Sequence, residues 1–167
     1  MLYTGHFKLA DDMIDHLDTV VSSTTDPFIQ SRYTGFVTIA AVTVYELAVK
    51  EIFIAFASTK HKVFGAFTDA FFSRLNGRIG LEDLKKYTAK FGSKYTKRFE
   101  RILQEADNQS FEDGKNSPRA AYGNVIVWRN AFAHQGALPT TATYSEATSA
   151  YHLGKEVLHS LARAMQR

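Results

Sequence analysis

The stretch that decides the fold is DPFIQSRYTGFVTIAAVTVYELAVKEIFIAFAS, residues Asp26–Ser58. It opens with Asp26 and Pro27, a pair typical of a helix start, because the carboxylate accepts an orphan backbone amide and proline is pre-set for the helical φ angle. The β-branched run Val37–Val44 would also suit a strand. Strands rarely exceed about ten residues, so the uninterrupted length predicts one long helix, with Tyr33–Gly35 as the one place where an interruption stays open.

The most apolar part of this helix, Phe36–Ser58, has the length of a membrane span. It contains Glu46, Lys50 and Glu51, and placing such a charge at the centre of a bilayer costs about 2.5–3.5 kcal/mol. A long, mostly buried helix is therefore expected, with no contact to a membrane. The N-terminal segment carries Lys8 but is otherwise rich in aspartate, which is the wrong polarity for a secretory signal. We expect a cytoplasmic protein.

The remaining chain also predicts helices. In Leu2–Ser23, apolar residues recur every three or four positions, and Leu9, Met13 and Leu17 mark the face expected to be buried. The last predicted helix has a similar stripe that includes Ala147, Gly154 and Leu161. Beyond the first two helices, the expected ranges are Val63–Leu75, Leu81–Phe91, Ser93–Gln109, a helix opened by Ser117-Pro118 and ended by Gly136, and Tyr144–Met165.

The predicted fold class is all-α. We expect a four-helix bundle of the up-and-down type, with short additional helices inserted between core helices 2 and 3. A length of 167 residues is typical of one domain, and a single helical domain over residues 1–167 is expected.

Composition excludes several classes of site. The chain has no cysteine, which rules out a disulfide scaffold, a zinc ribbon, a thiol nucleophile and an iron–sulfur centre. It also has no glycine-rich phosphate loop, no H-E-x-x-H, no G-x-S-x-G and no carboxylates at metal spacing. No metal and no cofactor are therefore expected. The net charge of +3 permits a polyanionic partner without requiring one.

One constellation carries chemistry, and it is WRNAFAHQG, Trp128–Gly136, at the end of the helix that Ser117 opens. At 100° per residue, Arg129 and His134 diverge by about 140° around the helix axis, whereas Asn130 and His134 share a face. A site using both Arg129 and His134 therefore needs long side chains or a second copy of the chain. A purely structural role for both residues stays open. A protonated His134 would be stabilised by the negative end of the helix dipole, and Arg129 would stack on the neighbouring Trp128.

The sequence Arg129-Asn130-x-x-x-His134 resembles the R-x4-H motif of the HEPN superfamily, the higher-eukaryote and prokaryote nucleotide-binding domains. The layout is similar too, because the motif ends the third core helix of a four-helix bundle and one long helix follows. The segment Tyr45–Lys50 in the earlier apolar helix also resembles the family. One element is missing: some HEPN toxins carry a tyrosine two residues after the histidine, where this chain has Gly136.

The resemblance implies a metal-independent endoribonuclease that works as a homodimer with a composite active site. RNA supplies its own 2′-hydroxyl nucleophile, so His134 would transfer protons near neutral pH and Arg129 would hold the phosphate oxygens. Asn130 would orient the histidine or the phosphate. The expected products are a 2′,3′-cyclic phosphate and a 5′-hydroxyl. The expected substrate is tRNA or mRNA, and an antitoxin or a larger defence-system partner is a further expectation.

Two other sets of residues are candidates around this motif. Glu46 lies in the most apolar helix, where the resemblance implies a polar residue near the cleft that orients Arg129 or His134; the plain alternative is an i, i+4 pair with Lys50. The segment Arg78–Arg101 has eight Lys and Arg against three acidic residues. Its candidate RNA-binding residues are Lys85, Lys86, Lys90, Lys94, Lys97 and Arg98.

Aromatic residues alternate with these cations at Tyr87, Phe91, Tyr95 and Phe99, at intervals of four. That spacing predicts a single stripe, which belongs more often to a core than to a base-stacking surface.

Two further interpretations of the whole chain stay open beside the nuclease. The first is a catalytically silent HEPN-like module that binds nucleic acid, nucleotide or a protein partner. The second is an unrelated helical adaptor in which Arg129 and His134 serve only packing and capping.

Overall fold

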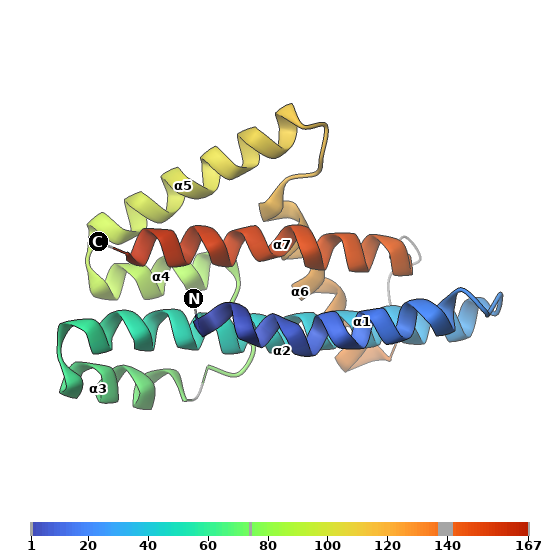
Figure 1. The fold of residues 1–167 in the computed structure, drawn as a ribbon, viewed down its shortest axis with the longest axis horizontal. Helices are drawn as coiled ribbons and strands as arrows, with labels where there is room; N and C mark the ends of the chain where they lie inside the picture. The colour runs from blue at the N-terminus through green and yellow to red at the C-terminus, as the bar shows by residue number, and fades with distance from the viewer. Residues whose placement is uncertain (1, 74, 137–141, 167) are drawn as a thin grey trace.

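The computed structural model describes residues 2–73, 75–136 and 142–166. These residues form a short 3-10 helix, Leu2–His6, and seven α-helices, and they contain no strand. The helices are α1 (Phe7–Val21), α2 (Pro27–Lys60), α3 (Lys62–Phe72), α4 (Leu81–Phe91), α5 (Ser93–Glu112), α6 (Pro118–Gln135) and α7 (Tyr144–Met165). The predicted all-α bundle is confirmed (Figure 1).

The long helix α2 is the centre of the arrangement. It packs against α1, α3, α6 and α7, and α6 packs in turn against α7 (Figure 1). Helices α2 and α7 run in the same direction along the molecule, while α1 runs in the opposite one. The predicted insert corresponds to α3, α4 and α5; α5 is longer than expected, since it has 20 residues and packs along α7.

Helix α2 begins where the Asp26-Pro27 pair predicts, and the Asp26 carboxylate accepts the backbone amide of Phe28 at 2.9 Å. The helix continues through Gly35 without a break. A Cβ atom at Gly35 would lie 2.4 Å from the ring of Phe132, so the glycine serves close packing with α6. The interruption considered at Tyr33–Gly35 is therefore absent.

The buried face of α1 differs from the predicted one. The buried residues of this helix are Phe7, Ala10, Ile14 and Leu17, whereas Leu9 is 63% exposed. This face places Phe7 and Ile14 in the core, and Asp11 beside it pairs with Lys155 of α7 at 2.6 Å. The expectation that Leu9 and Met13 line the core was wrong for Leu9, and Met13 is only partly buried.

Three tyrosines join α2, α6 and α7 in the core. Tyr45 is fully buried, with its ring stacked on Tyr122 at 5.0 Å and on Tyr151 at 5.9 Å between centroids. Its hydroxyl donates to the backbone carbonyl of Tyr151 at 2.6 Å. Gly154 lies beside that hydroxyl and belongs to the predicted stripe of α7, whose members are buried.

None of the helices in the described part of the chain combines the length and the apolar character that crossing a membrane requires.

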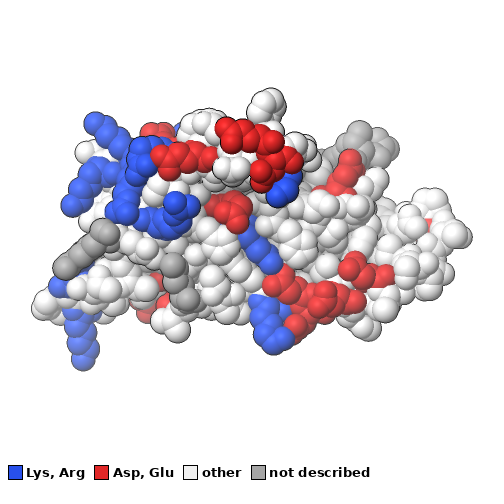
Figure 2. All heavy atoms as spheres, turned by 45° about the horizontal axis from the view of Figure 1, so that its top comes forward, with Lys and Arg blue, Asp and Glu red and all other residues white. Residues whose placement is uncertain are grey.

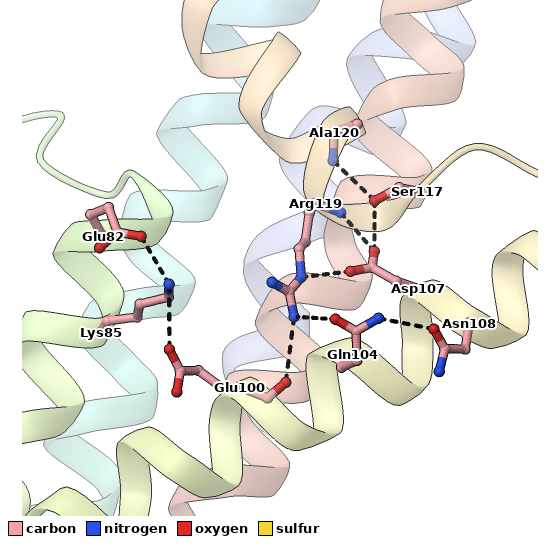
Figure 3. Close-up of polar contacts among 9 residues, drawn as sticks. All are labelled: Glu82, Lys85, Glu100, Gln104, Asp107, Asn108, Ser117, Arg119 and Ala120. Atoms are coloured by element: carbon pink, nitrogen blue, oxygen red, sulfur yellow. Dashed lines mark hydrogen bonds and ion pairs between the residues drawn. The ribbon is translucent and has the colours of Figure 1, made fainter.

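The start of α6 is held by a polar network from α5 (Figure 3). The Asp107 carboxylate accepts from the Ser117 hydroxyl at 2.7 Å and from the backbone amide of Arg119 at 3.2 Å, and it forms an ion pair with the Arg119 guanidinium. Ser117 itself caps the helix by accepting from the amide of Ala120. Asp107 thus adds a second acceptor to the orphan amides at this helix end.

Replacing Asp107 with alanine is expected to lower the free energy of unfolding by about 2 kcal/mol, because hydrogen bonds to a charged, largely shielded carboxylate are among the stronger ones. The Asp107 side chain is only 13% exposed. Urea unfolding of wild type and variant measures the change. Glu105→Ala is the matched control on the same helix, since its pair with Arg101 is exposed on both sides and contributes about 0–1 kcal/mol. Equal losses in the two variants would contradict the proposed role of Asp107.

Candidate functional site

The motif residues lie in the second half of α6. This helix ends at Gly136, whose φ of 65° is the left-handed conformation that favours glycine at a helix C-terminus. Arg32 on α2 donates to the Gly136 carbonyl at 2.8 Å. The turn that carries His134 is therefore fastened to α2 as well as being closed by its own backbone.

Arg129 reaches from α6 across to α2. Its Nη2 lies 3.2 Å from Oε1 of Glu46, and its Nη1 donates to Oδ1 of Asn130 at 3.0 Å. The side chains of Arg129 and Glu46 are 23% and 20% exposed, so the ion pair is partly shielded from water. The guanidinium is thus fixed in position by two acceptors at once.

Gly77, just beyond the predicted helix Val63–Leu75, also contacts this guanidinium. A Cβ atom at Gly77 would lie 2.8 Å from Nη2 of Arg129, and the residue has a φ of 78°. The loop is anchored by the Tyr122 hydroxyl, which donates to the carbonyl of Ile79 at 2.8 Å. Burial raises the pKa of the Tyr122 phenol well above its usual range, so the group stays a neutral donor.

The partner of Glu46 is Arg129. The carboxylate pairs across the bundle rather than with Lys50 on its own helix. Of the two partners considered for Glu46 that the structure could show, it contacts the motif arginine and not Lys50.

His134 is placed differently from the other motif residues. Its side chain is exposed in the last turn of α6, and it makes no hydrogen bond or ion pair with a residue that the structure describes. One chain therefore brings Arg129, Asn130 and Glu46 together and leaves the histidine open on the surface. This agrees with the divergence of about 140° between Arg129 and His134 on a straight helix.

Exposed apolar side chains surround the motif on a surface that we call the α2–α6 face. It consists of Phe36, Ile39 and Leu47 on α2 and Val127 on α6, which are 46%, 39%, 37% and 59% exposed. Val127, Asn130 and His134 share one side of α6, because residues three and seven apart lie on the same helix face. The open histidine therefore belongs to a partly apolar surface.

The candidate RNA-binding cations fall into two groups. Lys85 lies between Glu82 and Glu100, with its Nζ 2.9 and 3.4 Å from their carboxylates, and these contacts raise its pKa (Figure 3). Arg98 donates to the backbone carbonyl of Gln166. The exposed and unpaired members among the described residues are Lys86, Lys90, Lys94 and Lys97.

Figure 2 shows that Lys and Arg gather at one end of the visible face, over α4 and the start of α5, while Asp and Glu cover other parts of it. Part of the local positive charge predicted from Arg78–Arg101 is thus exposed, at Lys86, Lys90, Lys94 and Lys97.

The aromatic residues of this region belong to the core, as their spacing favours. Gly92 separates the predicted stripe into two helices, with Tyr87 and Phe91 on α4 and Tyr95 and Phe99 on α5. Phe91 stacks on Phe53 of α2 at 5.3 Å between ring centroids. The break between the two helices at Gly92 is the one expected from the sequence, and Phe56 of α2 contacts both Phe91 and Tyr95 across it.

The residues that the structure describes include no group of three or more His, Asp and Glu side chains placed to hold a metal ion together. The site therefore consists of a fixed arginine, its amide and carboxylate partners, and an open histidine.

An all-α bundle whose third core helix ends in R-N-x-x-x-H is the layout that the HEPN resemblance implies. The family model described as RiboL-PSP-HEPN matches residues 7–167, which is nearly the whole chain. The chain belongs to the HEPN superfamily and, within it, to the RiboL-PSP-HEPN family. No curated protein and no solved structure matches it.

Proposed function

We propose that this HEPN domain, taken as one unit over residues 1–167, is a metal-independent endoribonuclease. The observation that carries the proposal is the ion pair between Arg129 and Glu46. It holds a permanently charged guanidinium at the surface of α6 with its planar donors pre-oriented, on the same helix as the exposed His134.

The residue types suit cleavage of RNA by its own 2′-hydroxyl. His134 takes the hydroxyl proton or returns a proton to the 5′-oxygen, since the ordinary pKa of imidazole lies near neutral pH. Arg129 stabilises the charge that develops on the phosphate oxygens. Asn130, already bound to Arg129, orients the phosphate or the imidazole. The reaction leaves a 2′,3′-cyclic phosphate and a 5′-hydroxyl.

The working unit in this proposal is a homodimer with a composite active site. One chain carries a single motif histidine, whereas the reaction uses a base and an acid. Association through the α2–α6 face would bury Ile39, Leu47 and Val127 and bring the His134 of each chain toward the centre. Burying exposed apolar area is the favourable part of such an association.

We further propose that the enzyme acts in the cytoplasm as a toxin or defence effector on tRNA or mRNA. An uncontrolled nuclease needs a partner that restrains it, so an antitoxin or a larger defence-system component belongs to this proposal.

A second candidate is a catalytically silent HEPN module that binds nucleic acid, nucleotide or a protein partner. The same ion pair is the observation that favours it. Glu46 compensates the charge of Arg129, which weakens the attraction of this group for a phosphate. The two candidates differ in whether RNA is cut.

The test is to incubate the purified protein with total RNA and with tRNA in EDTA, comparing wild type with His134→Ala and Arg129→Ala. Cleavage by wild type is expected, with cyclic phosphate ends detected by mass spectrometry of the fragments, and both variants are expected to leave the RNA intact. His16→Ala is the matched control, because His16 is an exposed histidine on α1 and should keep full activity.

Intact RNA with wild type would reject the nuclease and favour the silent module. Cleavage that survives in both variants would reject the roles proposed for His134 and Arg129. Growth of cells expressing the protein gives an independent reading. Toxicity that His134→Ala relieves supports the nuclease, whereas equal growth with both forms contradicts it.

A further inference from the structure

Helix α3 exposes three aromatic rings, two of which also touch rings of the core, Phe64 at 5.7 Å from Phe91 and Phe71 at 5.0 Å from Phe72. Phe64, Phe67 and Phe71 are 37%, 67% and 45% exposed, and their spacing of three and four residues puts them on one side of the helix. The helix packs on α2 through other residues, since its buried members are Gly65, Thr68 and Phe72. Exposed apolar clusters of this kind mark binding surfaces more often than single exposed residues do.

Cations border these rings on the side of α4. The Lys90 ammonium lies 5.3 Å from the centre of the Phe71 ring. Lys86 lies one turn earlier on α4, and Lys94 follows at the start of α5. All three lysines are exposed and make no ion pair with a described residue. We call the three phenylalanines with Lys86 and Lys90 the α3–α4 face.

Three acidic residues lie on these two helices. Asp69 of α3 lies about 160° around the helix axis from Phe71. On α4, Glu82 is paired with Lys85, and Asp83 lies one turn before Lys86. The face therefore combines flat apolar surfaces with the exposed ammonium groups of Lys86 and Lys90, an arrangement that is complementary to a nucleic acid and unfavourable for a basic partner.

The α3–α4 face and the motif are joined by a short segment of chain. Gly77, which contacts the guanidinium of Arg129, lies six positions after Phe71, so the two residues are at most about 22 Å apart. Arg78 follows directly and is exposed. The distance is within the reach of a short single strand that contacts both places.

We propose that the α3–α4 face binds single-stranded RNA, with unpaired bases stacked on Phe67 and Phe71 and the backbone held by Lys86 and Lys90. Bases in a duplex present no free face to a protein ring, whereas unpaired bases stack on aromatic side chains without regard to sequence. This inference deepens the proposed nuclease function, because it names unpaired RNA as the substrate class that the enzyme takes.

The test measures binding without cleavage. The probe is a single-stranded 2′-O-methylated RNA oligonucleotide, which lacks the nucleophile, and fluorescence anisotropy gives its Kd with the wild-type protein and with Phe67→Ala and Phe71→Ala. Each variant is expected to bind about tenfold more weakly. Phe67 is 67% exposed, so Phe67→Ala should melt like wild type. Phe71 also contacts the ring of Phe72, so Phe71→Ala should melt at a somewhat lower temperature while remaining folded at the temperature of the binding assay. Phe111→Ala is the matched control, because Phe111 is 83% exposed on α5 and lies outside this face.

Two further measurements separate stacking from charge. The same oligonucleotide annealed to its complement should bind equally to wild type and Phe67→Ala. Lys90→Ala should reduce the slope of log Kd against log salt by about 1. An unchanged Kd in both phenylalanine variants overturns the proposal. If an oligomer of the wild-type protein also dissociates in these variants, the face is assigned to contact with a second copy of the chain.

Failure of the nuclease proposal is recognised separately. Binding that depends on Phe67 in a protein that leaves RNA uncut supports the α3–α4 face and rejects the enzyme. Cleavage that depends on His134 with no effect of Phe67 or Phe71 on binding does the reverse.

Discussion

Gly154→Ala is expected to destabilise the protein by about 3 kcal/mol, although alanine is by itself the better helix residue by about 1 kcal/mol. A Cβ atom at Gly154 would lie 2.4 Å from the hydroxyl of Tyr45 and 3.3 Å from the Cα of Tyr122. Tyr45 cannot give way, because it is fully buried and stacked between two other tyrosines. Moving its hydroxyl would also break the 2.6 Å hydrogen bond to the Tyr151 carbonyl.

Gly123→Ala is the matched control for this substitution. Gly123 lies in the interior of α6, and a Cβ atom there would have no neighbour within 4 Å. Its replacement should therefore raise the free energy of unfolding by up to about 1 kcal/mol through helix propensity. Urea denaturation measures both variants, and a second background, Tyr45→Phe, should recover part of the loss at Gly154 by removing the clashing oxygen. A stabilised Gly154→Ala protein would show that α2, α6 and α7 do not meet as closely as described.

Local signals in the sequence account for most helix boundaries. Asp26-Pro27 and Ser117-Pro118 start α2 and α6, and Gly136 ends α6, because caps, proline and left-handed glycine act within a few residues of the boundary. Leu81–Phe91 and Tyr144–Met165 agree with the structure residue for residue.

The orientation of α1 depended on a partner far along the chain. Its apolar residues allow two overlapping buried faces, and the observed one buries Phe7 and Ile14 and lets Asp11 contact Lys155 and Tyr151 on α7. Periodicity on one helix contains no information about which polar residue finds a partner across the bundle. Leu9 was therefore assigned to the wrong face.

Part of the candidate site could be predicted and part could not. Arg129, Asn130 and His134 are visible as a motif, and Glu46 stands out as a carboxylate in an apolar helix. Gly77 gave no such signal, because its role depends on a contact with Arg129 at a distance of 52 residues in sequence. The place of His134 in the proposed dimer could not be predicted either, because the sequence of one helix does not determine how two chains associate.

Arg129→Lys is expected to lower the rate of RNA cleavage by about 10²–10³-fold, the usual loss when one pre-oriented donor to a developing oxyanion is removed. The substitution keeps the positive charge, so the loss reports geometry. The arginine holds Glu46 with one nitrogen and Asn130 with the other, at 3.2 and 3.0 Å. A lysine ammonium is a point charge and cannot contact both while presenting a planar edge to a phosphate.

Glu46 acts in this scheme as a positioning residue, and Glu46→Gln separates positioning from charge compensation. Glutamine can still accept a hydrogen bond from Arg129. Because its amide is neutral, it lacks the charge–charge attraction of the carboxylate and holds the guanidinium less firmly. If positioning dominates, as we expect, kcat falls by about 10- to 100-fold while KM for RNA stays within a factor of about two, because the interaction matters in the transition state. A lower KM with unchanged kcat would instead show that the carboxylate chiefly masks the arginine. Glu51→Gln, five residues further along α2 and outside these contacts, is the control and should leave both constants unchanged.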